Sequence, residues 1–259
     1  MVKHLKNMEK RGQVTLFIIL GLIILIIIAL VLFGRNYAGI FMSSDKFLSL
    51  KTESIEKDIG NCITKEGSIM LNTVGKQGGS LDPSSYRYYD GNRVQYLCTD
   101  IPNERKCANN MFLLSDLEKE IGESLKLNIL SCIQTEKIAE KSFYQITTGD
   151  MKVNVDILDK NVVIDVNYPV TLRKGETELK LDEFIEEINV PLGEIYEHVV
   201  NIVEDEALNG EFFNVPYMLG HYGQVEIVKD TPYPDKLYKV NMKDSPYLFE
   251  FFVGDEPWK

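Results

Sequence analysis

The pattern of apolar and polar positions divides the chain after its first 34 residues. Residues 14–33 are apolar almost throughout and carry no charge. At about 1.5 Å per helical residue, such a run reaches roughly 30 Å, the thickness of the hydrocarbon core of a bilayer. We therefore predict a transmembrane helix over residues 13–34, preceded by a basic cytoplasmic leader over residues 1–12 and followed by an extracellular domain over residues 35–259.

Charges on the two sides of the apolar run set the expected orientation. The leader holds Lys3, Lys6, Lys10 and Arg11 against Glu9, a charge of +3 that leaves −14 for the rest of a chain with net charge −11. Basic residues stay on the cytoplasmic side, so we expect a single-pass protein of the cell membrane with its C-terminal domain outside. A cleaved secretory signal is the competing interpretation, but its apolar core would be only about 7–15 residues long.

Helical periodicity predicts three amphipathic helices in the domain. The first begins near Ser44 and ends near Gly75, with apolar positions spaced by three and four residues. The second follows a capping box at residues 115–118, in which a serine precedes a glutamate by three positions. The third begins after Pro191 and closes at Gly210.

Alternation with a period of two predicts strands between and after these helices. Asp90-Gly91 lies between aromatic and β-branched residues, which indicates a β-hairpin. Pro169 is expected to end the second strand of an antiparallel meander that begins at Met151. The other expected strands are residues 177–181, 224–229, 236–242 and 247–253. Helices and strands are segregated along the chain, which is typical of the α+β class.

The residues around Gly12 carry a more specific signal. The sequence Lys-Arg-Gly-Gln-Val-Thr over residues 10–15 runs directly into the apolar segment. This junction resembles the class III signal of archaeal type IV prepilins and archaellins. The resemblance covers about 25 residues and implies cleavage after Gly12 by a prepilin-type leader peptidase, leaving Gln13 as the new N-terminus. It further implies self-assembly through the N-terminal helix into a filament or pseudopilus; the alternative is a simple membrane anchor.

The four cysteines lie in the part of the chain predicted to be outside the cell, where disulfides persist. Three pairings are open, and we favour Cys98–Cys107, which closes a short loop, and Cys62–Cys132, which ties two predicted helices. Zinc is the rival interpretation, but there is no C-x-x-C pair and the spacing is irregular.

Motifs that carry enzymatic chemistry are missing from the sequence. It contains no H-E-x-x-H, G-x-S-x-G or Walker pattern, and its acidic balance argues against nucleic acid as a partner. We therefore expect no enzyme, no catalytic or metal-binding residues and no cofactor. The sparse candidates are Glu194 and His198, four apart on one helix and followed by Glu204 and Asp205, and His221 in a glycine-flanked loop.

Three functions remain open from the sequence. The first is a membrane-anchored, pilin-like structural protein of the cell surface. The second is a monomeric single-pass receptor or adhesin that binds through the tyrosines of the hairpin, Tyr86, Tyr88, Tyr89 and Tyr96. The third is an anchored hydrolase that uses Glu194, His198 or His221.

Overall fold

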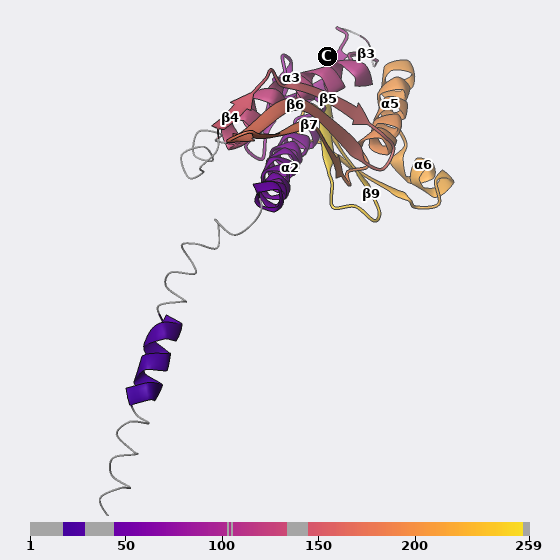
Figure 1. Ribbon diagram of the computed structural model, residues 1–259. Helices are drawn as coiled ribbons and strands as arrows, with labels where there is room; N and C mark the ends of the chain where they lie inside the picture. Colours follow the sequence, from indigo (N-terminus) through magenta and orange to yellow (C-terminus); the bar gives the residue numbers. More distant parts are fainter. Residues whose placement is uncertain (1–17, 29–43, 103, 105, 134–144, 256–259) are drawn as a thin grey trace, which may run out of the picture. The chain divides into compact units, whose positions relative to one another are not determined.

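The chain folds as two units that divide after Glu53. Figure 1 shows the computed structural model, which describes residues 18–28, 44–102, 104, 106–133 and 145–255. Helices and two antiparallel-rich sheets make up the second unit, residues 54–259, which confirms the α+β class. The cleavage site expected between Gly12 and Gln13 lies outside the described residues.

The apolar N-terminal run is helical over residues 18–28. None of the helices in the described ranges is both long and apolar enough to cross a membrane. The predicted transmembrane helix over residues 13–34 is therefore wrong, and so is the single-pass cell-membrane placement derived from it.

A four-stranded sheet forms the first layer of the second unit. Its longest strand, β6, pairs with β7 along one side and with β5 and then β4 along the other. The bounds are β4 Gln145–Thr148, β5 Lys152–Ile157, β6 Val162–Lys174 and β7 Thr177–Ile188.

Pro169 does not end β6, contrary to expectation. The pairing of β6 with β7 is irregular between Asn167 and Val170, and the Pro169 carbonyl accepts a hydrogen bond from Gly149. Proline is tolerated in a strand where the ladder is interrupted, because its missing N–H then costs no hydrogen bond. The strand continues past the proline, and its pairing changes there from β5 to β4.

A six-stranded sheet forms the second layer, with the order β1-β2-β10-β9-β8 and β3 also paired to β2. β10 runs parallel to β2, and the other pairs in this sheet are antiparallel. β1 and β8 therefore lie at opposite edges. The bounds are β1 Tyr86–Tyr89, β2 Asn92–Asp100, β3 Cys107–Asn109, β8 Val225–Asp230, β9 Lys236–Met242 and β10 Phe249–Val253.

Among the described residues, four helices accompany the sheets. Their bounds are α2 Ser44–Lys76, α3 Leu114–Ile133, α5 Leu192–Asn209 and α6 Asn214–Gly220. α3 packs on β5, α5 contacts strands of the six-stranded sheet, and α6 lies along β8. The predicted apolar faces of α2, α3 and α5 are buried, which confirms these three helices.

α2 contacts residues of both layers because glycines let it approach closely. A Cβ at Gly67 would lie within 2.7 Å of Ile164 and Ile188 of the four-stranded sheet. A Cβ at Gly75 would lie 2.4 Å from the carbonyl oxygen of Leu248, just before β10. These positions explain why two residues of low helix propensity stand in a long helix.

The capping box predicted at the start of α3 does not form. The helix begins at Leu114, one residue earlier, so Ser115 lies inside it. Glu118 Oε1 instead accepts a hydrogen bond of 2.9 Å from the backbone N–H of Ile157, at the end of β5. The glutamate thus fixes the helix to the sheet beneath it and does not cap its own helix.

Candidate functional site

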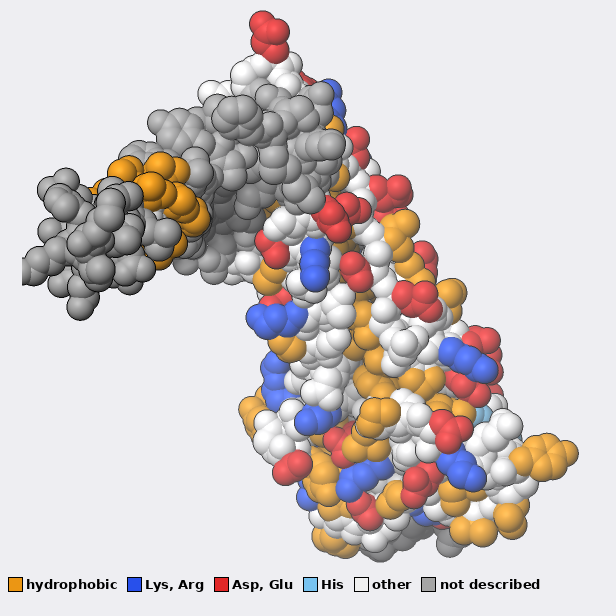
Figure 2. Space-filling view, turned by 60° about the horizontal axis from the view of Figure 1, so that its bottom comes forward, with side chains coloured by type: hydrophobic (Ala, Val, Ile, Leu, Met, Phe, Trp, Pro, Cys, Tyr) orange, Lys and Arg blue, Asp and Glu red, His pale blue; other side chains and the backbone are white. Residues whose placement is uncertain are grey.

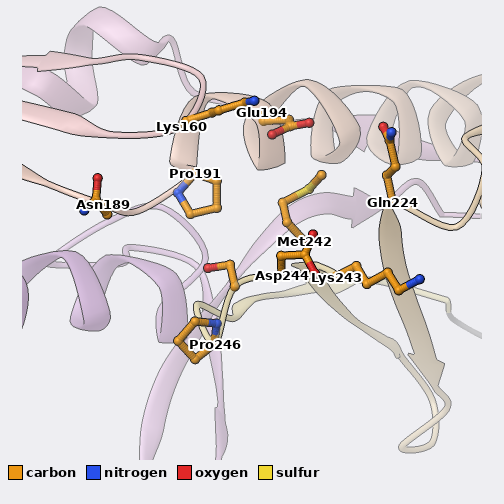
Figure 3. Close-up of a pocket in the computed structure, with 10 residues that line it drawn as sticks. Lys160, Asn189, Pro191, Glu194, Gln224, Met242, Lys243, Asp244 and Pro246 are labelled. Atoms are coloured by element: carbon orange, nitrogen blue, oxygen red, sulfur yellow. The ribbon is translucent and has the colours of Figure 1, made fainter.

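A hollow lies where the turn after β5, the start of α5 and the end of β9 meet (Figure 3). Its volume is about 590 Å³. Pro191 and Met242 are apolar residues of its wall, and Lys160 and Glu194 lie together at the top of the view. The other lining residues are Asn189, Gln224, Lys243, Asp244, Ser245 and Pro246. A small ligand can be considered for this hollow.

The chemistry of this hollow does not point to catalysis. It holds two lysines and two acids, and among the described residues none of the four forms an ion pair within 4 Å. Its only hydroxyl, on Ser245, accepts a hydrogen bond from the N–H of Tyr247, and no histidine lines it to act as a base. The hollow is therefore a polar depression without a nucleophile–base pair.

The start of α5 does not offer an anion site to the hollow. The N–H of Gly193 donates to the Leu158 carbonyl, and the N–H of Glu194 donates to the Asp159 carbonyl. The free N–H groups that usually attract anions at a helix N-terminus are thus already satisfied by the turn after β5.

The two candidate histidines of the domain do come together. The rings of His198 on α5 and His221 after α6 lie with centroids 5.2 Å apart, and Tyr217 contacts both. The Tyr217 hydroxyl lies 2.9 Å from His198 Nδ1 and accepts a hydrogen bond of 3.1 Å from Asn201 Nδ2. The Tyr217 hydroxyl donates to His198 Nδ1 in the tautomer protonated at Nε2 and accepts from it in the other tautomer.

The contacts of this histidine pair hold α5 and α6 together. Burial, together with the nearby His221, lowers the pKa of His198. Burial also raises the pKa of the Tyr217 hydroxyl, and the charge of Glu197 adds to that effect. A neutral imidazole hydrogen-bonded to a protonated tyrosine is a satisfied pair between α5 and α6.

The acids predicted near His198 do not join it. Glu194 lines the hollow described above, and Asp205 accepts a hydrogen bond from Asn209 one turn further along α5. Glu204 is exposed. In the part of the chain that the structure describes, no group of three metal-ligating side chains comes together. The acid–base or metal group considered for Glu194, His198 and His221 is therefore not assembled.

A buried ion pair that the sequence did not reveal lies at the other end of α5. Glu206 is 1% exposed and accepts hydrogen bonds from Lys236 Nζ at 2.8 Å, from the Tyr238 hydroxyl and from the N–H of Phe212. Burial lowers the pKa of Lys236, but the carboxylates of Glu206, Asp255 and Glu211 together outweigh burial and raise the pKa overall. No local pattern signals this pair, because its members come from a helix and a strand 30 positions apart.

The four tyrosines of the hairpin divide into two groups. Tyr86 and Tyr88 are exposed, and their rings meet edge to face with centroids 5.4 Å apart. Tyr89 contacts Phe252 and accepts a hydrogen bond from Lys239. The Tyr96 hydroxyl donates to Asp235, and burial followed by this carboxylate raises its pKa to about 12. Tyr86 and Tyr88 are therefore the more exposed pair of the four.

Both disulfides have the pairing favoured from the sequence. Cys62–Cys132 joins α2 to α3, and Cys98–Cys107 joins β2 to β3. All four cysteines of the chain are thus paired with each other, and none is left to bind zinc or to act as a nucleophile.

Comparisons with protein-family models, with curated proteins and with solved structures found no match to this chain.

Proposed function

We propose that this chain is a structural subunit, and not an enzyme, that assembles with copies of itself through its apolar N-terminal helix after cleavage between Gly12 and Gln13. The observation that carries the proposal is the helix of residues 18–28. Every isoleucine and leucine in it is between 49% and 68% exposed. A helix that is apolar on all sides is stable only where something covers it.

Burying the exposed side chains of this helix is strongly favourable. Burying one leucine or isoleucine side chain is worth roughly 1.5–3 kcal/mol, so covering the exposed remainder of this helix is worth on the order of ten kcal/mol. Helices of the same kind from neighbouring copies match it in length and in apolar character. The prepilin-like junction at residues 10–15 favours this occupant, since the resemblance implies that the mature N-terminal helices bundle together.

The rest of the chain supports a structural role. The hollow beside α5 lacks a nucleophile–base pair, and the two domain histidines are engaged in contacts between helices. Two disulfides cross-link a small α+β unit, and such a unit can serve as a structural subunit without a catalytic site.

The test uses the full chain made in its native host. We expect the assembled protein to begin at Gln13 by mass spectrometry and to sediment as a large species. Ile24→Lys places a charge in the apolar helix and should leave the protein monomeric. Leu127→Lys is the matched control, because Leu127 is exposed on α3 and the same charge there should leave assembly intact. An intact Met1 on a monomeric product would contradict the proposal.

A second candidate is a monomeric binding module. Tyr86 and Tyr88 are exposed, and the Arg93 guanidinium stacks over the Tyr86 ring at 5.4 Å, so one hairpin face offers aromatic and cationic groups together. In this case residues 1–34 would be only a tether. Replacing them with an unrelated segment should then leave ligand binding unchanged, and loss of binding in that exchange would count against the module.

A further inference from the structure

α6 is attached to the rest of the unit by a few polar contacts. None of its seven residues is buried. Two of its side chains bind the backbone of Ile227 on β8: Asn214 Nδ2 donates to the carbonyl at 3.1 Å, and Met218 Sδ accepts from the N–H at 3.1 Å. Tyr217 joins the helix to α5 through its hydrogen bond with His198. A short helix without a buried face opens more easily than the core elements of a domain.

The contacts with Ile227 cover the outer side of an edge strand. β8 ends the six-stranded sheet and pairs with β9 along its inner side. The N–H and the carbonyl of Ile227 are both bonded to side chains of α6, so they are directed at the helix and not at β9. An uncovered edge presents such backbone groups to other strands. α6 therefore closes the edge of β8 at this position, and its displacement would open the edge there.

The segment that can move with α6 has firm boundaries. Phe212 is 3% exposed and its carbonyl accepts a hydrogen bond from Lys229 Nζ, so the chain is fixed up to this residue. At the other end, Val225 already pairs with β9. Gly223 lies just before it with a φ of 68°, which glycine adopts without strain, and it provides a pivot. We call residues 213–223 the flap.

Two histidines lie where the flap meets α5. His221 belongs to the flap and His198, which is 9% exposed, to α5; their rings meet edge to face with centroids 5.2 Å apart. His221 Nδ1 lies 2.8 Å from the Tyr217 carbonyl, which can only accept, so this nitrogen carries a hydrogen. Figure 2 shows histidine atoms reaching the surface beside hydrophobic side chains. The histidine cluster is therefore open to protons from solvent.

Protonation of both rings places two positive charges at this contact with little to compensate them. Burial raises the pKa of the Tyr217 hydroxyl, which therefore stays neutral. Glu197 is an exposed acid on α5, where water screens its charge, and Glu194 lines the hollow. Among the described residues, neither histidine forms an ion pair with a carboxylate. Burial, followed by the nearby His221, accordingly lowers the pKa of His198.

We propose that the flap opens when His198 and His221 are protonated together, so that α6 is a pH-dependent cover of the β8 edge. Opening separates the two charges and returns His198 to water. Because the closed state binds a proton on His198 less readily than the open state, closure is complete above about pH 6.5 and is lost as the pH falls below it. No residue of the flap belongs to the buried core, so the remainder of the unit keeps its fold. The device lies within the folded unit and does not depend on self-assembly.

Hydrogen–deuterium exchange of the full-length chain tests the flap. Exchange is measured by mass spectrometry at pH 7.5 and pH 5 and corrected for the intrinsic effect of pH on amide exchange. The flap and the N–H of Ile227 should exchange on the order of tenfold faster at pH 5, while β9 and β10 keep their protection. Equal corrected exchange of the flap at both pH values would overturn the proposal. Loss of protection in β9 and β10 together with the flap would overturn it too, because the unit then unfolds as a whole.

Variants separate the charge of the histidines from their packing. His198→Gln and His221→Gln each remove one titrating ring but keep a polar side chain, and each should reduce the ratio of flap exchange at pH 5 to that at pH 7.5. Tyr217→Phe keeps both histidines and removes the hydroxyl, so the flap should exchange faster at both pH values with the ratio retained. Glu226→Gln, at an exposed acid on β8, is the matched control and should leave the ratio unchanged. A wild-type ratio in both histidine variants would show that these rings do not control the flap.

Discussion

Lys236 Nζ lies 2.8 Å from Glu206 Oε2, and the two side chains are only 6% and 1% exposed. Glu206 joins α5 to the start of β9 through this ion pair, and Lys236 also donates to the Gly210 carbonyl at the end of α5. The pair thus fixes the helix that leads into α6 onto the six-stranded sheet. Its stability contribution comes from the cost of separating its members, because a buried charge without a partner is strongly unfavourable.

Lys236→Met is expected to destabilise the protein by about 3–5 kcal/mol, since it leaves the Glu206 carboxylate buried without its cation. Urea unfolding followed by circular dichroism measures the change in the free energy of unfolding. Lys243→Met is the matched control. Lys243 is exposed beside the hollow and forms no ion pair among the described residues, so its replacement should change stability by less than about 0.5 kcal/mol. Equal effects of the two substitutions would contradict the role assigned to the pair.

Stability should depend on pH through His198. Burial and the nearby His221 lower its pKa in the folded state below the ordinary value of about 6.5. The unfolded chain therefore binds the proton first as the pH falls. Stability is fully present above about pH 6.5 and decreases as the pH drops from there toward the folded pKa.

His198→Gln removes this titration but keeps a polar side chain facing Tyr217. The urea midpoint of the wild-type protein should fall more steeply between pH 7 and pH 5 than that of the variant, with all other titrating groups common to both. Parallel curves for the two proteins would show that His198 does not titrate in this window.

The two disulfides should differ in their contributions. Cys62–Cys132 closes a loop with a sequence separation of 70, and Cys98–Cys107 closes one with a separation of 9. In the chain-entropy model, loss of the first costs about 4 kcal/mol and loss of the second roughly 2.5 kcal/mol. Unfolding of the double variants Cys62→Ala with Cys132→Ala and Cys98→Ala with Cys107→Ala compares them. A larger loss for the short loop would indicate that native packing, and not loop entropy, dominates.

Gly193→Ala should weaken the junction at the start of α5. A Cβ there would lie 2.6 Å from the carbonyl oxygen of Leu158, so the helix or the turn after β5 must shift. We expect a loss of about 1–3 kcal/mol, the usual cost of overpacking. Gly21→Ala and Gly220→Ala serve as controls, because no atom lies within 4 Å of a Cβ at either position. Thermal unfolding distinguishes the three variants.

The sequence predicted those features that are formed by residues close together along the chain. The apolar spacing of α2, α3 and α5, the Asp90-Gly91 turn and the glycine at the end of α5 all predicted structure that is present. Asp90 and Gly91 both adopt positive φ, as a two-residue hairpin turn requires. Such features depend on a few neighbouring residues and can be recognised in one sequence.

The features that were missed depend on partners far along the chain. The parallel pairing of β10 with β2 joins the end of the described chain to its first hairpin, and no spacing in the sequence announces it. Pro169 lies where the pairing of β6 with β7 is irregular and where the partner on the other side changes from β5 to β4. α6 escaped notice because its apolar residues face solvent, so its periodicity does not indicate a core-facing helix.

Only the individual residues of the candidate site could be predicted from the sequence, and not which of them come together. Glu194 and His198 lie on the same helix, but the Glu194 side chain lines the hollow and the His198 side chain contacts Tyr217 of α6. The approach of His221 to His198 depends on α6 and could not be read from spacing. Three of the hairpin tyrosines lie on β1 and Tyr96 lies on β2, and only contacts with Phe252 and Asp235 decide which of them face inward.

The bond between Cys62 and Cys132 changes how the protein responds to pulling. When tension is applied along the chain from the N-terminal end of α2 to the C-terminus, it crosses from one cysteine to the other through covalent bonds. The residues between them cannot be drawn out. At about 3.5 Å per extended residue, roughly 240 Å of contour length is withheld from stretching. A unit tethered through its first helix would therefore lengthen under load only outside residues 62–132.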